Sequence, residues 1–159
     1  MIIFINGSIN SGKSTVSKIL AEKIERPVVV EIDALSDFIK GVPVEEKIQI
    51  NLENAILVIR NFSKRGFNVI VPYPLSHKNY DYMIGELNDI SEKIFVFTLN
   101  PEKEIALKNR GERELDDWER QRIEYHYSIG INSPSFGVII DNTNQAAKET
   151  AEIILNSIK

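Results

Sequence analysis

Residues 7–15 read Gly-Ser-Ile-Asn-Ser-Gly-Lys-Ser-Thr and follow directly on the apolar segment Ile2–Ile5. They fit the phosphate-binding pattern G-x-x-x-x-G-K-[ST] at every fixed position. Glycines let backbone N–H groups converge on phosphate oxygens, and the N-terminus of the following helix adds a partial positive charge. Because the segment lies between a predicted strand and a predicted helix, we predict a phosphate-binding loop, or P-loop, at Gly7–Thr15.

The polar positions of this loop have expected roles. Lys13 is expected to neutralise the β- and γ-phosphates of ATP, and the Ser14 hydroxyl is expected to coordinate Mg²⁺. Further nucleotide contacts are expected from Gly7, Asn10, Ser11, Gly12 and Thr15. The sequence therefore predicts ATP and Mg²⁺ as the ligands of this loop.

Short apolar runs alternate with amphipathic stretches along the chain. Helical periodicity is present from Ile48 to Phe62 and from Ala147 to Ile158, with Thr143 or Asn144 as the N-cap of the second helix. This alternation predicts a three-layer α/β/α P-loop NTPase sandwich with a five-stranded parallel sheet, and one domain over residues 1–159. The predicted strands are Ile2–Ile5, Val28–Ile32, Asn68–Val71, Ile94–Leu99 and Val138–Ile140.

The composition excludes several classes of function. The chain has 159 residues, a net charge of −4 and no block of basic residues, so nucleic acid and anionic membranes are poor candidates for partners. Without cysteine it has no disulfide, no thiolate metal ligand and no cysteine nucleophile. No apolar run approaches the roughly 20 residues that span a bilayer. We expect a cytoplasmic protein that is a monomer or a homodimer.

Two carboxylates follow the second predicted strand, whereas the third and fourth strands end without one. Glu31 and Asp33 are two residues apart, so on a strand they would lie on the same side, beside the P-loop. One carboxylate would support Mg²⁺ through water, and Asp33 would accept the proton of an attacking hydroxyl. Asp37 is a further candidate for contact with the acceptor. Alternatively, Asp33 caps the following helix.

Charged and polar residues follow the fourth and fifth strands. Arg113, and secondarily Arg110, would stabilise the transferring phosphoryl group, on a lid segment at about 110–118. A solvated helix end explains that segment equally well. Asn142 and Thr143 are expected to meet the adenine edge. His77 and His126 have no metal-like spacing, and we interpret both as ordinary polar residues.

With these features the chain resembles the small-molecule kinase branch of P-loop proteins, whose fold is nucleoside-kinase-like, including shikimate and chloramphenicol kinases. Glu31-x-Asp33 resembles the D-x-D of shikimate kinases, but Pro72-Tyr73-Pro74 stands where those enzymes have three glycines, which argues against shikimate. The chain is most similar to the tunicamycin-resistance ATP-binding family. The matching residues are Met1-Ile2-Ile3, Ile5-Asn6-Gly7, Ile70-Val71-Pro72, Tyr80, Ile84-Gly85, Leu87, Phe97-Thr98-Leu99, Lys103-Glu104, Leu107-Lys108, Arg113, Trp118, Ser133-Pro134, Phe136 and Asp141-Asn142.

The resemblance implies ATP binding with phosphate transfer to, or sequestration of, a small molecule. We therefore expect a kinase that transfers the γ-phosphate of ATP to a hydroxyl of a metabolite or antibiotic, with Lys13, Asp33 and Arg113 as its catalytic residues. The alternative is an ATP-dependent protein that sequesters a ligand without transfer. A regulatory ATPase is disfavoured by the missing acids on the third and fourth strands.

Overall fold

The computed structural model describes residues 1–90, 92–109 and 114–159, and within them five strands form one parallel sheet in the order β2-β3-β1-β4-β5. The strands are β1 (Ile2–Gly7), β2 (Pro27–Val29), β3 (Asn68–Pro72), β4 (Ile94–Leu99) and β5 (Val138–Ile140). Strand β1 lies at the centre, with Ile3 paired to Ile70 on one side and to Phe95 on the other. The parallel five-stranded sheet predicted from the sequence is confirmed.

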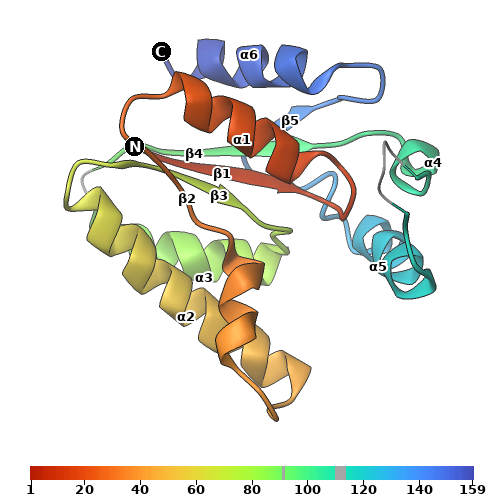
Figure 1. Ribbon diagram of the computed structural model, residues 1–159, viewed down its shortest axis with the longest axis horizontal. Helices are drawn as coiled ribbons and strands as arrows, with labels where there is room; N and C mark the ends of the chain where they lie inside the picture. The colour runs from red at the N-terminus through yellow and green to blue at the C-terminus, as the bar shows by residue number, and fades with distance from the viewer. Residues whose placement is uncertain (91, 110–113) are drawn as a thin grey trace.

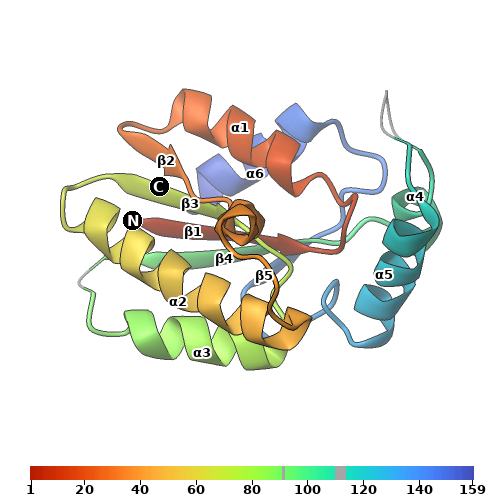
Figure 2. The ribbon, with the colours of Figure 1, turned by 60° about the horizontal axis from the view of Figure 1, so that its bottom comes forward.

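Helices cover both faces of the sheet, which confirms the three-layer arrangement (Figures 1 and 2). Helices α1 (Lys13–Lys23) and α6 (Ala147–Ser157) lie on one face, and α2 (Val44–Ser63) and α3 (His77–Leu87) lie on the other. Because side chains alternate along a strand, Ile3 and Ile5 of β1 pack in the core beneath α1 and α6. Phe4 packs in the core that α2 and α3 cover.

The second strand is shorter than predicted. We expected Val28–Ile32, but β2 ends at Val29 and the chain turns into the 3₁₀ helix η1 (Ile32–Phe38). The Val30 N–H still bonds to the Ile70 carbonyl at 2.9 Å, after which the chain leaves the sheet. The turn places the side chain of Ile32 fully inside the core, and an apolar residue buried in this way is indistinguishable from a strand residue by hydrophobicity alone.

The C-terminal helix begins later than predicted. Its N-cap is Ala146 rather than Thr143 or Asn144, and the Glu149 carboxylate accepts the Ala146 N–H at 2.7 Å. Thr143 is engaged elsewhere, because its hydroxyl donates to Asp141 at 2.6 Å and accepts the Glu102 N–H at 2.9 Å. A glutamate in the first turn thus satisfies the helix end that we had assigned to Thr143 or Asn144.

Helices α4 (Lys103–Ala106) and α5 (Asp117–Ser128) lie at the end of the sheet to which the strands point (Figures 1 and 2). They have a small core of their own, built from Ala106, Leu115 and Ile123. Helix α5 starts at Asp116, whose carboxylate accepts the Glu119 N–H at 2.7 Å while Glu119 bonds back to the Asp116 N–H. In the described residues, no helix is long and apolar enough to cross a membrane.

Candidate nucleotide-binding site

A cavity of about 400 Å³ lies at the carboxyl ends of the central strands, where parallel α/β sheets bind their ligands. Its volume is within the range of small-molecule sites, roughly 300–1,000 Å³. The lining comes from the P-loop and α1, from the segment after β2, from the end of β3 and from the turn after β5. The lining residues are Ile9, Asn10, Gly12, Lys13, Ser14, Thr15, Val16, Glu31, Asp33, Pro72, Asn142, Gln145 and Ala147.

The two fixed glycines of the loop are required for different structural reasons. A Cβ at Gly7 would lie 2.6 Å from both the Leu99 carbonyl oxygen and the Ser11 Oγ, so this position is closed to any side chain. Gly12 has φ near +100° and a Cβ there would meet only the Asn142 amide at 3.8 Å, so backbone conformation is the constraint. Gly7 and Ser11 are buried and are not among the described residues that line the cavity, so they support the loop from the side away from the cavity.

Lys13 and Ser14 begin helix α1 and both face the cavity. The Lys13 ammonium donates to the Ser8 carbonyl oxygen at 2.6 Å. The side chain is therefore folded over the loop rather than directed fully into solvent. Ser14 and Thr15 are exposed to the cavity, so both hydroxyls are accessible to a ligand.

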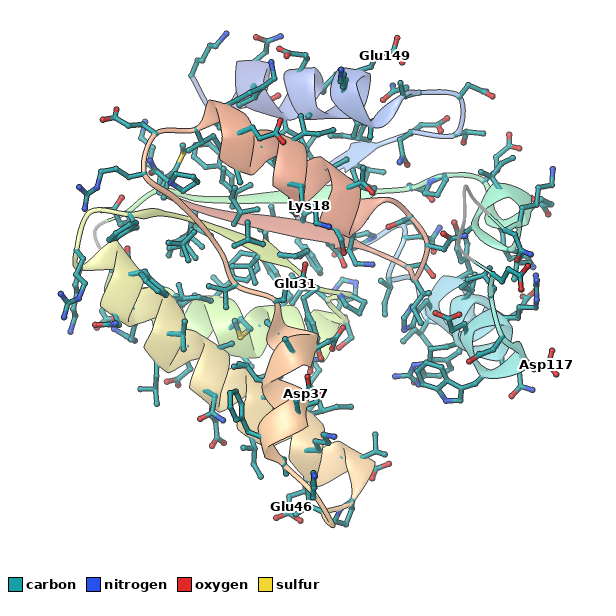
Figure 3. The ribbon with its side chains drawn as sticks, viewed as in Figure 1. Lys18, Glu31, Asp37, Glu46, Asp117 and Glu149 are labelled. Atoms are coloured by element: carbon teal, nitrogen blue, oxygen red, sulfur yellow. The ribbon has the colours of Figure 1, made fainter. Side chains whose placement is uncertain are left out.

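Glu31 and Asp33 both line the cavity. They come from the segment after β2, at the start of η1, and not from the P-loop. Strand alternation does not bring them together as we expected, because Asp33 belongs to η1. Figure 3 shows Glu31 where the chain leaves the sheet, and Asp37 farther along η1 and farther from α1. Asp37 is absent from the described lining of the cavity.

The surroundings of Asp33 raise its pKa above the ordinary value. The side chain is exposed to the cavity, yet partial desolvation by the protein atoms around it is the main cause of the raised pKa, and the positive charge of Lys13 opposes it. Next to it in the fold, burial and the Asp33 charge raise the pKa of the buried Tyr73 phenol to about 12, against the opposing charge of Arg122. Tyr73 therefore stays protonated at neutral pH, and Asp33 is a stronger base than an exposed aspartate.

The turn after β5 approaches the loop from the other side. The Asn142 side-chain N–H donates to the Ser11 carbonyl oxygen at 2.9 Å, and its Oδ1 is buried without a hydrogen-bond partner. Asn142 thus supports the loop and, together with Gln145 and Ala147, also lines the cavity. Thr143 is outside the described lining and joins the turn to the start of α4 through Glu102.

The arginines divide into two groups. Arg110 and Arg113, our candidates for the transferring group, lie outside the described residues, as does the first half of the proposed lid at 110–118. Two further arginines, Arg120 and Arg122, lie on α5. Arg120 donates to the Leu107 carbonyl and to Asn109, while the Arg122 guanidinium stacks 4.8 Å from the ring centroid of Tyr125.

Two residues behind the loop were missed or misread from the sequence. His126, which we interpreted as an ordinary polar residue, is 2% exposed and its Nδ1 lies 3.3 Å from the Ser8 Oγ. Asn6 is fully buried; its amide donates to Thr98 and Ile131, and its Oδ1 accepts the Leu75 N–H at 2.7 Å. An asparagine at the end of an otherwise apolar strand was the available signal for the second of these.

The donor set suits a magnesium ion that is carried by a nucleotide. Among the described residues, no group of three or more His, Cys, Asp and Glu side chains could hold a metal. Mg²⁺ retains several waters and takes phosphate oxygens as ligands, so it needs few protein groups. One hydroxyl, from Ser14, and two carboxylates, from Glu31 and Asp33, line the same cavity and fit this requirement.

No family model matches the chain. A curated relative, the cytidylate kinase of Archaeoglobus fulgidus, is 28% identical over 171 aligned residues, which cover 100% of this chain and 95% of the relative. The solved tunicamycin resistance protein of Deinococcus radiodurans superposes with a TM-score of 0.71 at 18% identity, covering 99% of this chain and 94% of that one. The fold is that of the P-loop kinases.

A second P-loop kinase structure shows the same likeness. The APS kinase of Mycobacterium tuberculosis, solved in complex with AMPPNP and APS, gives a TM-score of 0.68 at 19% identity, over 99% of this chain and 96% of that chain. The resemblance to kinase-like P-loop proteins expected from the sequence is confirmed. At these identities the structural likeness establishes the fold of a P-loop kinase and leaves the acceptor to be argued from the cavity.

Proposed function

We propose that this chain is an ATP-dependent phosphotransferase that moves the γ-phosphate of ATP to a hydroxyl of a small metabolite or antibiotic. The observation that carries the proposal is the placement of Asp33, with its raised pKa, in one cavity with Lys13 and Ser14 of the P-loop. A phosphate-binding loop alone serves many ATPases. A basic carboxylate beside it is the additional group that alcohol activation requires.

The proposed chemistry assigns each group one task. The loop amides and Lys13 hold the β- and γ-phosphates, and the acceptor oxygen attacks the γ-phosphorus as its bond to the ADP oxygen breaks. Asp33 takes the proton that the attacking hydroxyl loses. Ser14, and through water Glu31 or Asp33, would hold Mg²⁺, which would neutralise part of the phosphate charge. Arg113 is proposed to stabilise the transferring group.

The acceptor pool for a test follows from both the cavity and the relatives. A hydroxyl acceptor must lose a proton, whereas a nucleoside monophosphate such as cytidylate offers a phosphate oxygen that is already ionised at neutral pH. The relative from Archaeoglobus fulgidus places cytidylate in the pool. Dependence of turnover on the Asp33 carboxylate distinguishes the two classes of acceptor, because only a hydroxyl acceptor needs a general base.

The test is incubation of the protein with γ-labelled ATP, Mg²⁺ and a pool of hydroxylated metabolites, antibiotics and cytidylate, followed by separation of labelled products. We expect a labelled phosphate ester that depends on Lys13. A labelled product formed equally by Lys13→Ala would come from a contaminant. Labelled cytidine diphosphate would show that the acceptor is a phosphate group and not an alcohol.

The second candidate is an ATP-dependent protein that sequesters its ligand without phosphotransfer. The end of β3 favours it, because Pro72 and the protonated Tyr73 phenol stand where other P-loop proteins place a carboxylate for Mg²⁺. Isothermal titration with pool compounds separates the two. Tight, ATP-dependent binding of a compound that never becomes labelled would favour sequestration.

A further inference from the structure

The P-loop is attached to the α4–α5 unit by apolar and polar contacts. Ile9, at a variable position of the loop motif, packs against the small core of Ala106, Leu115 and Ile123. The Asn10 amide donates to the carbonyl oxygens of Ala106 at 2.8 Å and Lys108 at 2.9 Å. The loop is therefore attached to α4 by contacts within the protein itself.

His126 supplies the contact from α5. Its Nδ1 lies 3.3 Å from the Ser8 Oγ and 3.4 Å from the Ile9 backbone nitrogen, both at the long end of hydrogen-bond distances. A backbone N–H can only donate, so Nδ1 must be the unprotonated nitrogen of the ring. The neutral ring then carries its proton on Nε2, and Nδ1 accepts from the loop.

The protonation state of the ring agrees with this role. Burial, together with the positive charges of Arg122 and Lys13, lowers the pKa of His126 to about 4. The imidazole is thus neutral at physiological pH. A neutral acceptor adds no positive charge that would compete with Lys13 for the phosphates, and it does not repel that lysine.

We propose that His126 is a positioning residue of the nucleotide site, holding Ser8 and Ile9 so that the loop is already shaped for phosphate when ATP arrives. The inference rests on the proposed nucleotide-binding function of the loop. The same Ser8 residue receives Lys13 on its carbonyl oxygen at 2.6 Å, so His126 and Lys13 fix one residue from two directions. Preorganised donors bind a ligand more tightly than donors that must first be ordered.

The test uses three substitutions that differ in where they place an acceptor. His126→Asn puts its Oδ1 near the position of Nδ1, His126→Gln puts its amide group near the position of Nε2, and His126→Phe keeps a ring without an acceptor. Two readouts are measured: the affinity for Mg²⁺·ATP by titration calorimetry, and hydrogen exchange of the Ile9 amide in the nucleotide-free protein. Tm is measured in parallel to report the state of the fold.

We expect the Phe and Gln variants to bind Mg²⁺·ATP roughly fivefold more weakly and to exchange the Ile9 amide faster, since a net hydrogen bond is lost in each. The Asn variant should stay within about twofold of the wild type. Equal losses in all three variants would make His126 a packing residue only, and unchanged affinity and exchange in the Phe variant would also overturn the proposal.

The second histidine of the chain provides a matched control. His77 is exposed at the start of α3, with its ring 5.2 Å from that of Phe136. His77→Asn should leave both readouts unchanged, and a comparable loss there would refute a specific role for His126. If the wild type transfers phosphate to no acceptor, the proposed function fails while both readouts still test His126. If it binds no ATP, amide exchange alone decides.

Discussion

The two walls of the cavity are built in different ways. The loop wall is held by Asn10, by His126 and by Asn142, which bond it to α4, to α5 and to the turn after β5. The η1 wall, which carries Asp33, is anchored through the buried Ile32 and through the Asn51 amide, which donates to the Ser36 Oγ at 2.6 Å. Its last residue, Phe38, is 85% exposed.

Under the proposed function, nucleotide binding and acceptor chemistry would have separate structural supports. A loop braced by neighbouring elements is ordered before it meets phosphate, whereas an exposed 3₁₀ turn can adjust to what it contacts. Substitutions in the loop wall should therefore act on ATP affinity. Substitutions in the η1 wall should act on turnover or on acceptor affinity.

The largest expected effect comes from Asp33→Asn. The amide keeps the shape of the carboxylate but cannot take a proton, so turnover with an alcohol acceptor should fall by about 10²–10⁴-fold. ATP affinity should change little, because the loop wall is intact. The measurement is steady-state kinetics beside calorimetric titration of Mg²⁺·ATP.

The opposite pattern would redefine Asp33. Weak Mg²⁺·ATP binding with otherwise normal turnover would make it a ligand around the metal and pass the base role to Glu31 or Asp37. If neither quantity changes, Asp33 has no chemical role and sequestration becomes the better function. Glu46→Gln, at the exposed start of α2 and outside the described cavity lining, is the control for loss of one negative charge.

Lys13→Ala should have the next largest effect, on the other wall. Loss of a charged hydrogen-bond donor to phosphate weakens Mg²⁺·ATP binding by about 10–100-fold, which can place it below detection. The variant also loses the bond from Lys13 to the Ser8 carbonyl, so a small decrease in Tm is expected. Unchanged ATP affinity would show that ATP does not bind at this loop. Lys18→Ala, farther along α1, is the control.

The pH dependence of turnover should reveal Asp33. Only its carboxylate form accepts a proton, so turnover should fall by about tenfold per pH unit below its pKa, and burial places that pKa above the ordinary aspartate value. The folded state also binds this proton more tightly than the unfolded chain. The stabilising contribution of the protonated group is therefore present at low pH and lost as pH rises through the raised pKa. Asp33→Asn should abolish the fall in turnover at low pH, as measured in a pH–rate profile. If the fall is retained in the variant, another group causes it.

The smallest effect is expected from Ser36→Ala. It removes the hydroxyl that accepts the Asn51 amide and leaves a buried donor unpaired, which should lower the free energy of unfolding by about 1–3 kcal/mol. Denaturant titration measures that loss, and KM for the acceptor should rise while ATP affinity stays constant. A fall in ATP affinity would mean that the two walls are coupled. Ser157→Ala, on the exposed face of α6, is the control.

Local pattern predicted the sheet, its layers and the position of the loop. The β4 and β5 bounds match, and the loop motif required only its fixed positions Gly7, Gly12, Lys13 and Ser14. The end of β2 was misjudged because Ile32 is as apolar as a strand residue, although it is buried by a turn. The role of His126 depends on a contact with Ser8 across 118 residues of sequence, and no local period carries such information.

The central place of β1 in the sheet has a consequence for how such a protein can diversify. The loop emerges between the ends of β3 and β4, so its framework is set by strands that are buried on both faces. The η1 segment follows β2 at one margin of the sheet, and α5 precedes β5 at the other. Substitutions on the exposed sides of these margins could therefore alter what is recognised without changing the buried strands from which the loop emerges.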